Sequence, residues 1–299
     1  MKKIKEKSKN SILFNTIATI VIVLHLLLVF LPCLWGIMQS FKSEYYYAFD
    51  KIGFSPNPDL TNYELVWNHL NWLVTPVGSP SRTVFVEEGI LNTFLYAGGT
   101  SIVGFIVQYM VAYVLFRFKH FKSSPVFYTI IVIAINLPLA GGVASSLKLY
   151  RTLGLYDNMI AMWIMNAHPL NFYFLVLYSA LYIIPNDLYE AAEMDGAGRI
   201  RIMVQIALPL VKGVVLLFFL EAFITAWNDY ATCLMFMPSY PTIGYMLFQF
   251  NQKSNPPEIV YSGVKLAAAF LCALPVIIVF VIFGNKMMKG VSVSGGIKG

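Results

Sequence analysis

Residues 190–209 read E-A-A-E-M-D-G-A-G-R-I-R-I-M-V-Q-I-A-L-P, a polar stretch between two long apolar segments. Asp187 and Glu190 have the spacing of a capping box, which predicts a short helix with Asn186 or Asp187 as its N-cap. Gly196 is the expected end of this helix, because glycine adopts the left-handed backbone conformation at little cost. A second short helix is predicted from there to the start of the next apolar segment.

One face of the first predicted helix is small and apolar. Leu188, Ala191 and Ala192 fall at i, i+3 and i+4 and share this face, whereas Glu190 and Glu193 point away from it. Two adjacent alanines leave room for the surface of another protein to approach closely. From these residues alone, an ordinary loop with a helical turn is as good an interpretation as a contact surface.

Composition indicates the class of protein. Hydrophobic residues make up 58% of the chain and charged residues 12%, compared with roughly 45–50% and about 25% in soluble domains. Together with a mean hydropathy of +0.67, these values indicate a polytopic membrane protein. Cys33, Cys233 and Cys272 all fall in apolar segments, where we expect buried small side chains and neither disulfides nor a metal site.

The apolar segments predict an all-α protein that crosses the membrane six times. Each crossing needs about 20 residues, and six segments are long enough, at roughly 14–38, 90–116, 126–147, 159–184, 209–235 and 260–284. The two termini and the 117–124 and 185–212 connections carry 14 of the 21 basic residues, which places both termini in the cytoplasm. The net charge of +6 follows this topology and does not indicate a nucleic acid partner.

The predicted divisions are a basic cytoplasmic N-terminus (1–13), a six-helix membrane domain (14–284) and a cytoplasmic tail (285–299). Within the membrane domain, segment 185–209 is cytoplasmic and segment 39–89 lies outside. Aromatic and turn residues are frequent in 39–89, so we expect an ordered cap on the membrane surface. Its stretch 60–73 predicts a helix capped by Thr61 or Asn62.

Several motifs are absent from the sequence. It has no G-x-x-x-x-G-K-[ST] loop for ATP, no G-x-S-x-G, and no His, Cys and Glu group with metal spacing. We therefore expect no catalytic residue, cofactor or metal on this chain. A metal-dependent lipid-linked transferase that uses Asp187, Glu190, Glu193 and Asp195 is disfavoured, because helical spacing scatters these carboxylates. A secondary transporter is disfavoured because charge is concentrated mainly in one apolar segment.

That segment is the fifth, in which Glu221 and Asp229 lie roughly 80° apart on the helical wheel. Ionisable groups at membrane depth usually face a cavity or a partner helix. The W-N-D-Y run at 227–230 is therefore either part of a translocation path or an interhelical hydrogen-bond network. The same alternatives hold for the polar residues and prolines that interrupt other apolar segments, namely Asn136, Pro138, Asn166, His168, Pro169 and Asn171.

These residues together resemble a known family, the binding-protein-dependent permeases of ABC importers. The polar stretch is similar to the signature loop of these permeases at Glu190, Ala191, Ala192, Gly196, Ile206, Leu208 and Pro209. The W-N-D-Y run and the glycine-rich end at 295–299 are similar to those of maltose-type sugar permeases. Within that group the chain is most similar to the shorter subunit of a heterodimeric pair.

The resemblance implies a type I importer fold in the bacterial cytoplasmic membrane and the import of a carbohydrate. A permease for a non-sugar solute is the alternative. The implied partners are a second homologous permease subunit, two ATP-binding subunits that hold ATP and Mg, and an extracellular or periplasmic solute-binding protein.

The resemblance also implies roles for individual residues. The coupling residues, which would contact an ATPase, are Glu190, Ala191, Ala192, Asp195, Gly196, Ile206, Leu208 and Pro209. A second ATPase contact by the C-terminal tail would involve Gly295, Gly296 and Lys298. The candidate path residues are Glu221, Trp227, Asn228, Asp229 and Tyr230.

The missing phosphate-binding loop generates a first prediction. The purified chain alone should hydrolyse no ATP, because it has no backbone cradle for the phosphates. The measurement is phosphate release by the chain purified from a strain in which contaminating ATPases are removed. Turnover above the background of a mock purification would contradict the prediction.

Overall fold

The computed structural model describes residues 2–76, 79–137, 142–254 and 256–294, with side chains over 11–282 of these ranges. Over the described residues the regular structure is helical apart from one two-stranded sheet, which confirms the all-α class. The chain forms two compact units. One contains the residues up to His69 together with Phe250–Leu271, and the other contains Leu70–Gln249 together with the residues from Cys272 onward.

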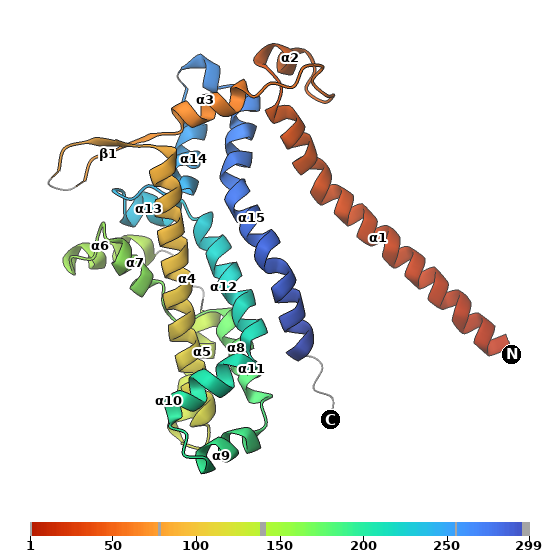
Figure 1. Cartoon of the computed structure of the whole chain (residues 1–299), viewed down its shortest axis with the longest axis vertical. Helices are drawn as coiled ribbons and strands as arrows, with labels where there is room; N and C mark the ends of the chain where they lie inside the picture. Colours follow the sequence, from red (N-terminus) through yellow and green to blue (C-terminus); the bar gives the residue numbers. More distant parts are fainter. Residues whose placement is uncertain (1, 77–78, 138–141, 255, 295–299) are drawn as a thin grey trace. The chain divides into compact units, whose positions relative to one another are not determined.

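The elements of the first unit are α1 (Lys2–Ser40), α2 (Glu44–Phe49), α3 (Thr61–His69), η2 (Pro257–Ile259) and the first part of α15 (Ser262–Ser294) (Figure 1). α1 is strongly apolar, and none of its most apolar 18-residue window, of mean hydropathy 2.8, is buried within the chain. A helix without a polar face must be surrounded by lipid or by another protein. α1 therefore carries the first predicted span.

The start of α3 differs from the prediction. The carboxylate of Asp59 accepts hydrogen bonds from the Thr61 backbone N–H (3.0 Å) and hydroxyl (2.7 Å), so Asp59 caps the helix and not Thr61 or Asn62. Asn62 is buried instead, and its amide donates to the carbonyl oxygens of Ser40 and Lys42 at 2.7 Å each. This side chain attaches α3 to the end of α1.

Lys42 is charged and fully buried in the same unit. Its ammonium group donates to the backbone carbonyl oxygen of Asp50 and lies 3.4 Å from the Asp50 carboxylate. The backbone N–H groups of Gly53 and Ile52 donate to this carboxylate and, together with Lys42, lower the pKa of Asp50. Because a buried charge is tolerated only when paired and hydrogen-bonded, these contacts fix the fold of the segment after α1.

The second unit holds a short hairpin and most of the helices. Its elements are β1 (Trp72–Val74), β2 (Arg82–Val84), α4 (Val86–Arg117), α5 (Ser123–Asn136), α6 (Gly142–Thr152), α7 (Met159–Met165), α8 (Phe172–Tyr182), α9 (Asn186–Met194), α10 (Arg199–Ile202), η1 (Met203–Ala207), α11 (Leu208–Leu210), α12 (Lys212–Trp227), α13 (Ala231–Phe236), most of α14 (Ile243–Gln252) and the later part of α15.

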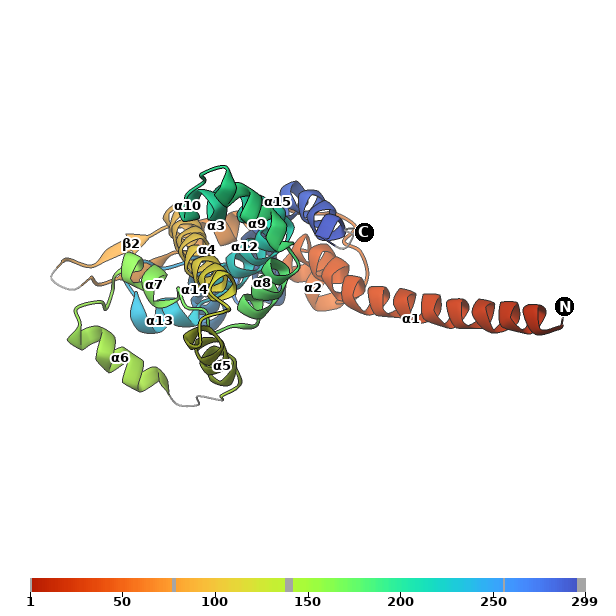
Figure 2. The ribbon, with the colours of Figure 1, turned by 90° about the horizontal axis from the view of Figure 1, so that it is seen from below.

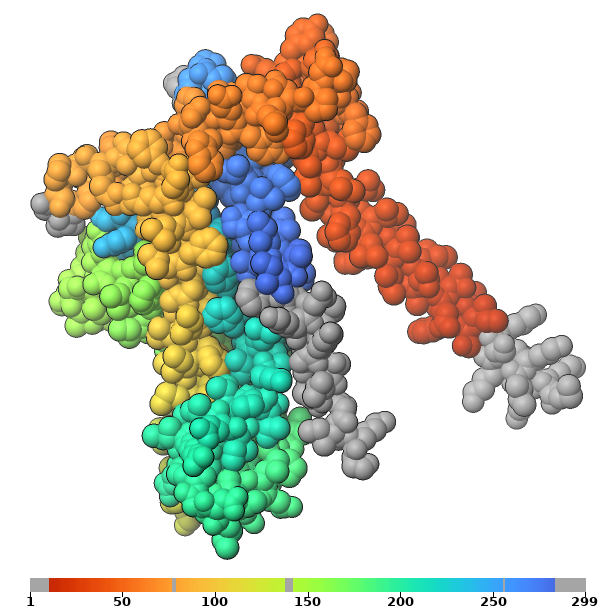
Figure 3. Space-filling view, viewed as in Figure 1, coloured from red at the N-terminus to blue at the C-terminus, as the bar shows by residue number. Residues whose placement is uncertain are grey.

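α4 is the central helix of this unit. It packs along α12 and against α7 and α8, as two perpendicular views show (Figures 1 and 2). A Cβ atom at Gly99 would lie 2.1 Å from the ring of Trp163, so glycine is required where α7 approaches α4. In Figure 3 the green and teal atoms of α9, α10 and α11 gather into one lobe at an end of this unit.

The number of membrane crossings stays a prediction. Among the described residues, α1, α4 and α15 are long and apolar enough to cross a membrane. The pair Arg199–Leu210 and Lys212–Trp227, bent by 82°, gives a fourth crossing if it is counted as one span.

Three predicted spans are not continuous helices. The 209–235 span turns by 82° between α11 and α12, and it is interrupted again after Trp227, because α13 begins only at Ala231. The prediction of one span over 126–147 is wrong, because α5 ends at Asn136 and a separate helix, α6, begins at Gly142. The 159–184 span is divided into α7 and α8 by six residues that include Pro169, which has no N–H to donate. In all three spans a break occurs where polar residues or prolines interrupt the apolar sequence.

Two smaller predictions also need correction. The helix predicted over 60–73 ends at His69, because Trp72 and its neighbours pair as a strand with β2. Val74 is buried whereas Leu73 is exposed, which is the alternation of a strand. Cys233 and Cys272 are buried as expected, but Cys33 is exposed, because it lies on the part of α1 that the described residues of its own unit leave uncovered.

The buried amide of Asn62 generates a second prediction. Asn62→Ala should destabilise the segment between α1 and α3 by about 1–3 kcal/mol, because two backbone carbonyl groups lose their donor. Native-state proteolysis of the purified protein measures the free energy of this local opening. Asn57→Ala is the matched control, since the Asn57 side chain is exposed. Equal cleavage of the two variants would contradict the prediction.

Candidate functional site

The polar stretch of the sequence forms α9 and the turn that follows it. α9 begins at Asn186, and no side chain caps its first turn, so the predicted capping box between Asp187 and Glu190 is wrong. The helix starts directly after Pro185, which places Asp187 inside the first turn. Its carboxylate there interacts favourably with the positive end of the helix dipole.

The end of α9 is as predicted. Gly196 has a φ of +77°, the left-handed conformation. The N–H of Ala197 donates to the carbonyl oxygen of Ala192 (2.9 Å), and the N–H of Gly196 donates to that of Glu193 (3.0 Å). These two bonds form a Schellman motif, which satisfies carbonyl groups that the end of a helix leaves free. The chain therefore turns sharply into α10.

The predicted contact face of α9, formed by Leu188, Ala191 and Ala192, is only partly exposed. Tyr189 and Ala192 are buried, whereas Leu188 and Ala191 are exposed. Met194, at the end of the helix, is 87% exposed. Because Ala192 packs inward, only Ala191 of the adjacent alanines lies on the free surface. The exposed face of α9 thus carries apolar side chains between carboxylates, a composition suited to contact with another protein.

Tyr189, which the sequence analysis did not single out, joins α9 to the end of α4. Its ring centroid lies 5.7 Å from that of Phe116, and the Arg117 guanidinium lies 5.5 Å from the Tyr189 ring. Arg117 also forms an ion pair with Glu193 of α9. Burial raises the pKa of Tyr189 to about 12. Its hydroxyl has no hydrogen-bond partner among the described residues.

The second predicted helix is present as three joined pieces, α10, the π-helix η1 and α11. Ile206 and Leu208 are half-buried and pack against the same hydrophobic core as Tyr189, whereas Pro209 is exposed. The hydroxyl of Tyr109 on α4 donates to the Met203 carbonyl oxygen at 2.6 Å. These contacts attach the whole segment from α9 to α11 to α4. The tail residues Gly295, Gly296 and Lys298 lie outside the described residues.

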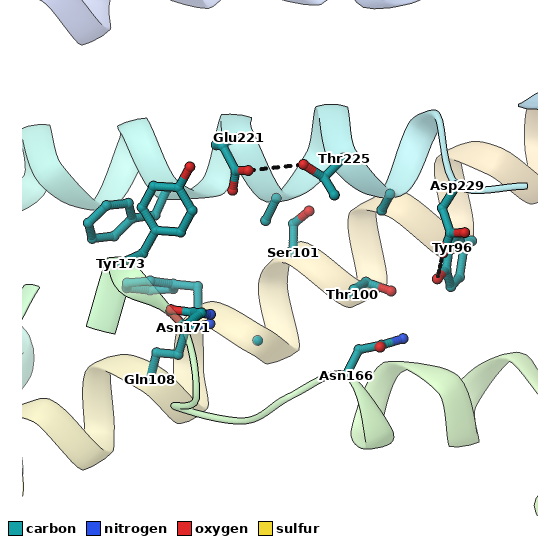
Figure 4. A pocket seen from close by; sticks show the side chains of 15 residues that line it. Tyr96, Thr100, Ser101, Gln108, Asn166, Asn171, Tyr173, Glu221, Thr225 and Asp229 are labelled. Atoms are coloured by element: carbon teal, nitrogen blue, oxygen red, sulfur yellow. Dashed lines mark hydrogen bonds between the residues drawn. The ribbon is translucent and has the colours of Figure 1, made fainter. Parts of the chain in front are cut away.

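A polar cavity lies among α4, α12, α8 and the connection between α7 and α8 (Figure 4). Its volume is about 300 Å³. The polar and aromatic side chains of its wall are Tyr96, Thr100, Ser101, Gln108, Asn166, Asn171, Tyr173, Glu221, Thr225 and Asp229. The cavity offers many hydrogen-bonding groups beside aromatic rings.

Two of the five candidate path residues line this cavity. Glu221 Oε1 accepts a hydrogen bond from the Thr225 hydroxyl at 3.0 Å. Asp229 Oδ2 accepts one from the Tyr96 hydroxyl at 2.9 Å, and Asp229 Oδ1 accepts one from the Thr232 backbone N–H at 3.0 Å. Asp229 therefore both faces the cavity and holds the start of α13.

The other three candidates do not belong to the cavity wall. Trp227 is buried, and its indole N–H donates to the Cys272 carbonyl oxygen at 3.1 Å. The Asn228 amide is exposed and donates to a carbonyl oxygen of α12 at 2.8 Å. Tyr230 stacks on Phe248, with the ring centroids 4.5 Å apart. Trp227 thus makes an interhelical hydrogen bond of the kind that was the alternative to a path role, whereas Asn228 bonds within its own helix and Tyr230 makes a stacking contact.

α4 contributes cavity residues that were not among the predicted path residues. Ser101 and Gln108 lie seven residues apart, so they share one helix face, and this polar stripe within an apolar segment was an available signal. Asn166 and Asn171 were recognised as interruptions, and both line the cavity. Asn171 also caps α8 by accepting the Phe174 backbone N–H at 3.0 Å. No group of three or more His, Cys, Asp and Glu suited to a metal ion occurs among the described residues.

Comparison with known proteins identifies the family. Residues 11–291 match the family described as "Binding-protein-dependent transport system inner membrane component". The chain belongs to this family. It is therefore a transport permease and a multi-pass protein of a bacterial inner membrane.

Individual relatives agree with this assignment. The permease is 28% identical over 284 residues to the inner membrane ABC transporter permease protein YcjP of Escherichia coli (strain K12), covering 92% of this chain and 94% of the relative. It is 30% identical over 224 residues to the melibiose/raffinose/stachyose import permease protein MelC of Bacillus subtilis (strain 168), covering 71% and 76%.

A solved structure shares the fold of the permease. It is the crystal structure of a bacterial ABC transporter involved in the import of the acidic polysaccharide alginate. One of its chains matches with a TM-score of 0.73 and 20% identity, over 91% of this chain and 96% of that chain. At this identity the match shows a common fold and nothing about the cargo.

The left-handed Gly196 generates a third prediction. Gly196→Asp should abolish association with an ATPase while leaving membrane insertion intact, because a Cβ atom in this conformation costs about 1–2 kcal/mol and the carboxylate adds charge to a contact surface. Co-purification of an ATPase with the tagged permease measures the association. Gly154→Asp is the matched control, since Gly154 has a similar φ of +68° outside the segment from α9 to α11. Normal ATPase recovery with Gly196→Asp would show that this turn has no coupling role.

Proposed function

We propose that this chain is the permease subunit of an ATP-driven carbohydrate importer, in which it supplies half of the translocation path and one ATPase contact. The main support for the proposal is that one helix, α4, lines the cavity and also holds the helix proposed to contact the ATPase. Its residues from Tyr96 to Gln108 line the polar cavity, and its end at Phe116 and Arg117 holds α9. A force on α9 would thereby reach the cavity wall through a continuous helix.

The exposed surface of α9 is the proposed ATPase contact. Glu190, Ala191 and Asp195 lie on this surface, and Gly196 turns the chain away from it. The proposed role of Ile206, Leu208 and Ala192 in coupling is indirect. These residues pack in or against the hydrophobic core and hold α9 and η1 in place. The absence of a phosphate-binding loop from the sequence supports the assignment of ATP and Mg to separate subunits.

A carbohydrate is the proposed cargo. Hydroxyl, amide and carboxylate groups in the cavity wall can exchange hydrogen bonds with sugar hydroxyl groups, and Tyr96, Tyr173 and Phe218 supply aromatic faces. The relative MelC is named for the import of melibiose, raffinose and stachyose, which supports this class of solute. The proposed assembly further contains a second permease subunit, two ATP-binding subunits and a solute-binding protein.

Reconstitution of the transport complex tests this function and provides a fourth prediction. Proteoliposomes that contain the permease and these partners from the same genome should take up a labelled oligosaccharide only with ATP and the binding protein present. Asp229→Ala should lower uptake per assembled complex, because it removes a carboxylate from the cavity. Asn228→Ala is its neighbour and matched control, since the Asn228 amide lies outside the cavity wall.

Two results would contradict the proposal. Uptake of a non-sugar solute, with no uptake of any sugar, would assign the permease to another cargo. Equal uptake per complex by the Asp229→Ala and wild-type permeases, with reduced thermal stability of the variant, would give Asp229 a structural role alone.

A further inference from the structure

The cavity wall has an unbalanced charge. None of the fifteen residues that line it carries a positive charge, whereas Glu221 and Asp229 contribute two carboxylates (Figure 4). Tyr173 lies beside Glu221, and Thr225 lies one helical turn further along α12 on the same side. The remaining polar groups are hydroxyls and amides, which are uncharged.

Neither carboxylate is neutralised within the described part of the chain. Glu221 and Asp229 accept hydrogen bonds from neutral groups, among them the hydroxyl groups of Thr225 and Tyr96 and the backbone N–H of Thr232. The ion pairs between described residues join Lys42 to Asp50, Arg82 to Glu88 and Arg117 to Glu193, and none of them reaches the cavity. Neutral donors stabilise a carboxylate but leave its negative charge in place.

The charge has opposite consequences for two classes of sugar. An uncharged sugar can donate its hydroxyl groups to the carboxylates of Glu221 and Asp229, and charge-assisted hydrogen bonds of this kind are the stronger ones. A sugar acid would bring its own carboxylate close to two fixed negative charges in a partly enclosed space, where water screens poorly. Thr100 Oγ1, which is buried and has no hydrogen-bond partner among the described residues, adds a further neutral donor or acceptor to the wall.

We propose that this cavity selects carbohydrates without negative charge, and that Glu221 and Asp229 exclude sugar acids from the path. The proposal rests on the proposed function and names the substrate class of the same site. It separates this permease from the alginate importer, with which it shares a fold but whose cargo is an acidic polysaccharide.

A paired uptake assay tests the proposal in the complete reconstituted importer. The neutral probes are maltotriose, raffinose and cellotriose, and the acidic probes are trigalacturonate and trimannuronate. Each is supplied with the binding protein at a concentration that saturates that protein, so that differences in delivery are removed. The wild-type importer should take up at least one neutral probe at least ten times faster than either acidic probe, a factor that corresponds to about 1.4 kcal/mol.

Three variants locate the selectivity in the cavity. Glu221→Gln and Asp229→Asn keep the size of the side chain and remove its charge, and each should raise the uptake ratio of acidic to neutral probe threefold or more. Glu87→Gln removes an exposed carboxylate outside the cavity wall and should leave the ratio unchanged. Asp229→Asn retains an oxygen for the Thr232 N–H, so that folding at α13 is preserved.

The outcomes distinguish this inference from the proposed function. Uptake of an acidic probe by the wild type at the rate of the neutral ones overturns the inference and leaves carbohydrate import intact. An unchanged ratio in both Glu221→Gln and Asp229→Asn also overturns it, because selectivity would then arise elsewhere in the importer. If no sugar of either class is taken up with ATP, the proposed function fails and the inference fails with it.

Discussion

The burial of Tyr189 against Phe116 is the contact on which the end of the second unit that carries α9 depends. Burial of a large apolar side chain stabilises a fold by about 1.5–3 kcal/mol. The Arg117–Glu193 pair beside it is part-exposed, and such pairs contribute about 0–1 kcal/mol. The aromatic contact therefore holds α9 on α4. The orientation of α9 is set by Arg117, which pairs with Glu193 and lies over the Tyr189 ring. The position of α9 in turn determines where the chain turns at Gly196 and where η1 meets the core.

A related constraint explains how the cavity wall can be polar within apolar helices. Side chains on α4 and α12 satisfy part of their hydrogen bonding on their own helix: the Ser101 hydroxyl donates to the Ala97 carbonyl oxygen at 2.6 Å, and Thr225 donates to Glu221. Such local bonds lower the cost of placing a polar group in an apolar environment. The groups keep further capacity to bond a solute, because a hydroxyl oxygen accepts as well as donates.

The sequence predicts best those features that depend on a single residue or on overall composition. The left-handed Gly196 and the all-α class follow from backbone chemistry and composition, and both are confirmed. The predicted contact face of α9 was only partly right, because Ala192 is buried together with Tyr189, and helical spacing alone does not reveal that the Tyr189 ring packs against Phe116 of α4. The strand at Trp72 was missed because it pairs with residues that lie after the turn, Trp72 with Val84, and such pairing is not a local property.

The residues of the candidate site also differ in how far the sequence could identify them. Glu221 and Asp229 could be chosen from sequence since charge within an apolar helix is conspicuous, whereas Trp227, Asn228 and Tyr230 shared their motif but point to other neighbours. Only tertiary packing decides which side of α12 meets α4. Ser101 and Gln108 show the converse, because uncharged polar residues at helical spacing are a weaker signal than charge, and the cavity that they share forms only in the folded protein.

The geometry of α4 suggests why coupling and selectivity can coexist in one chain. From Tyr96 to Phe116 the helix extends about 30 Å at 1.5 Å per residue. It is continuous over this length, so a tilt imposed at α9 moves the cavity wall as a rigid element and not by local unfolding. α12, the opposite wall, is bent by 82° from the segment that precedes it, and this bend allows the two walls to move differently. Selectivity by charge requires no precise fit, because electrostatic repulsion acts over several ångströms. A cavity that changes shape during transport can therefore keep its preference for uncharged solutes throughout the cycle.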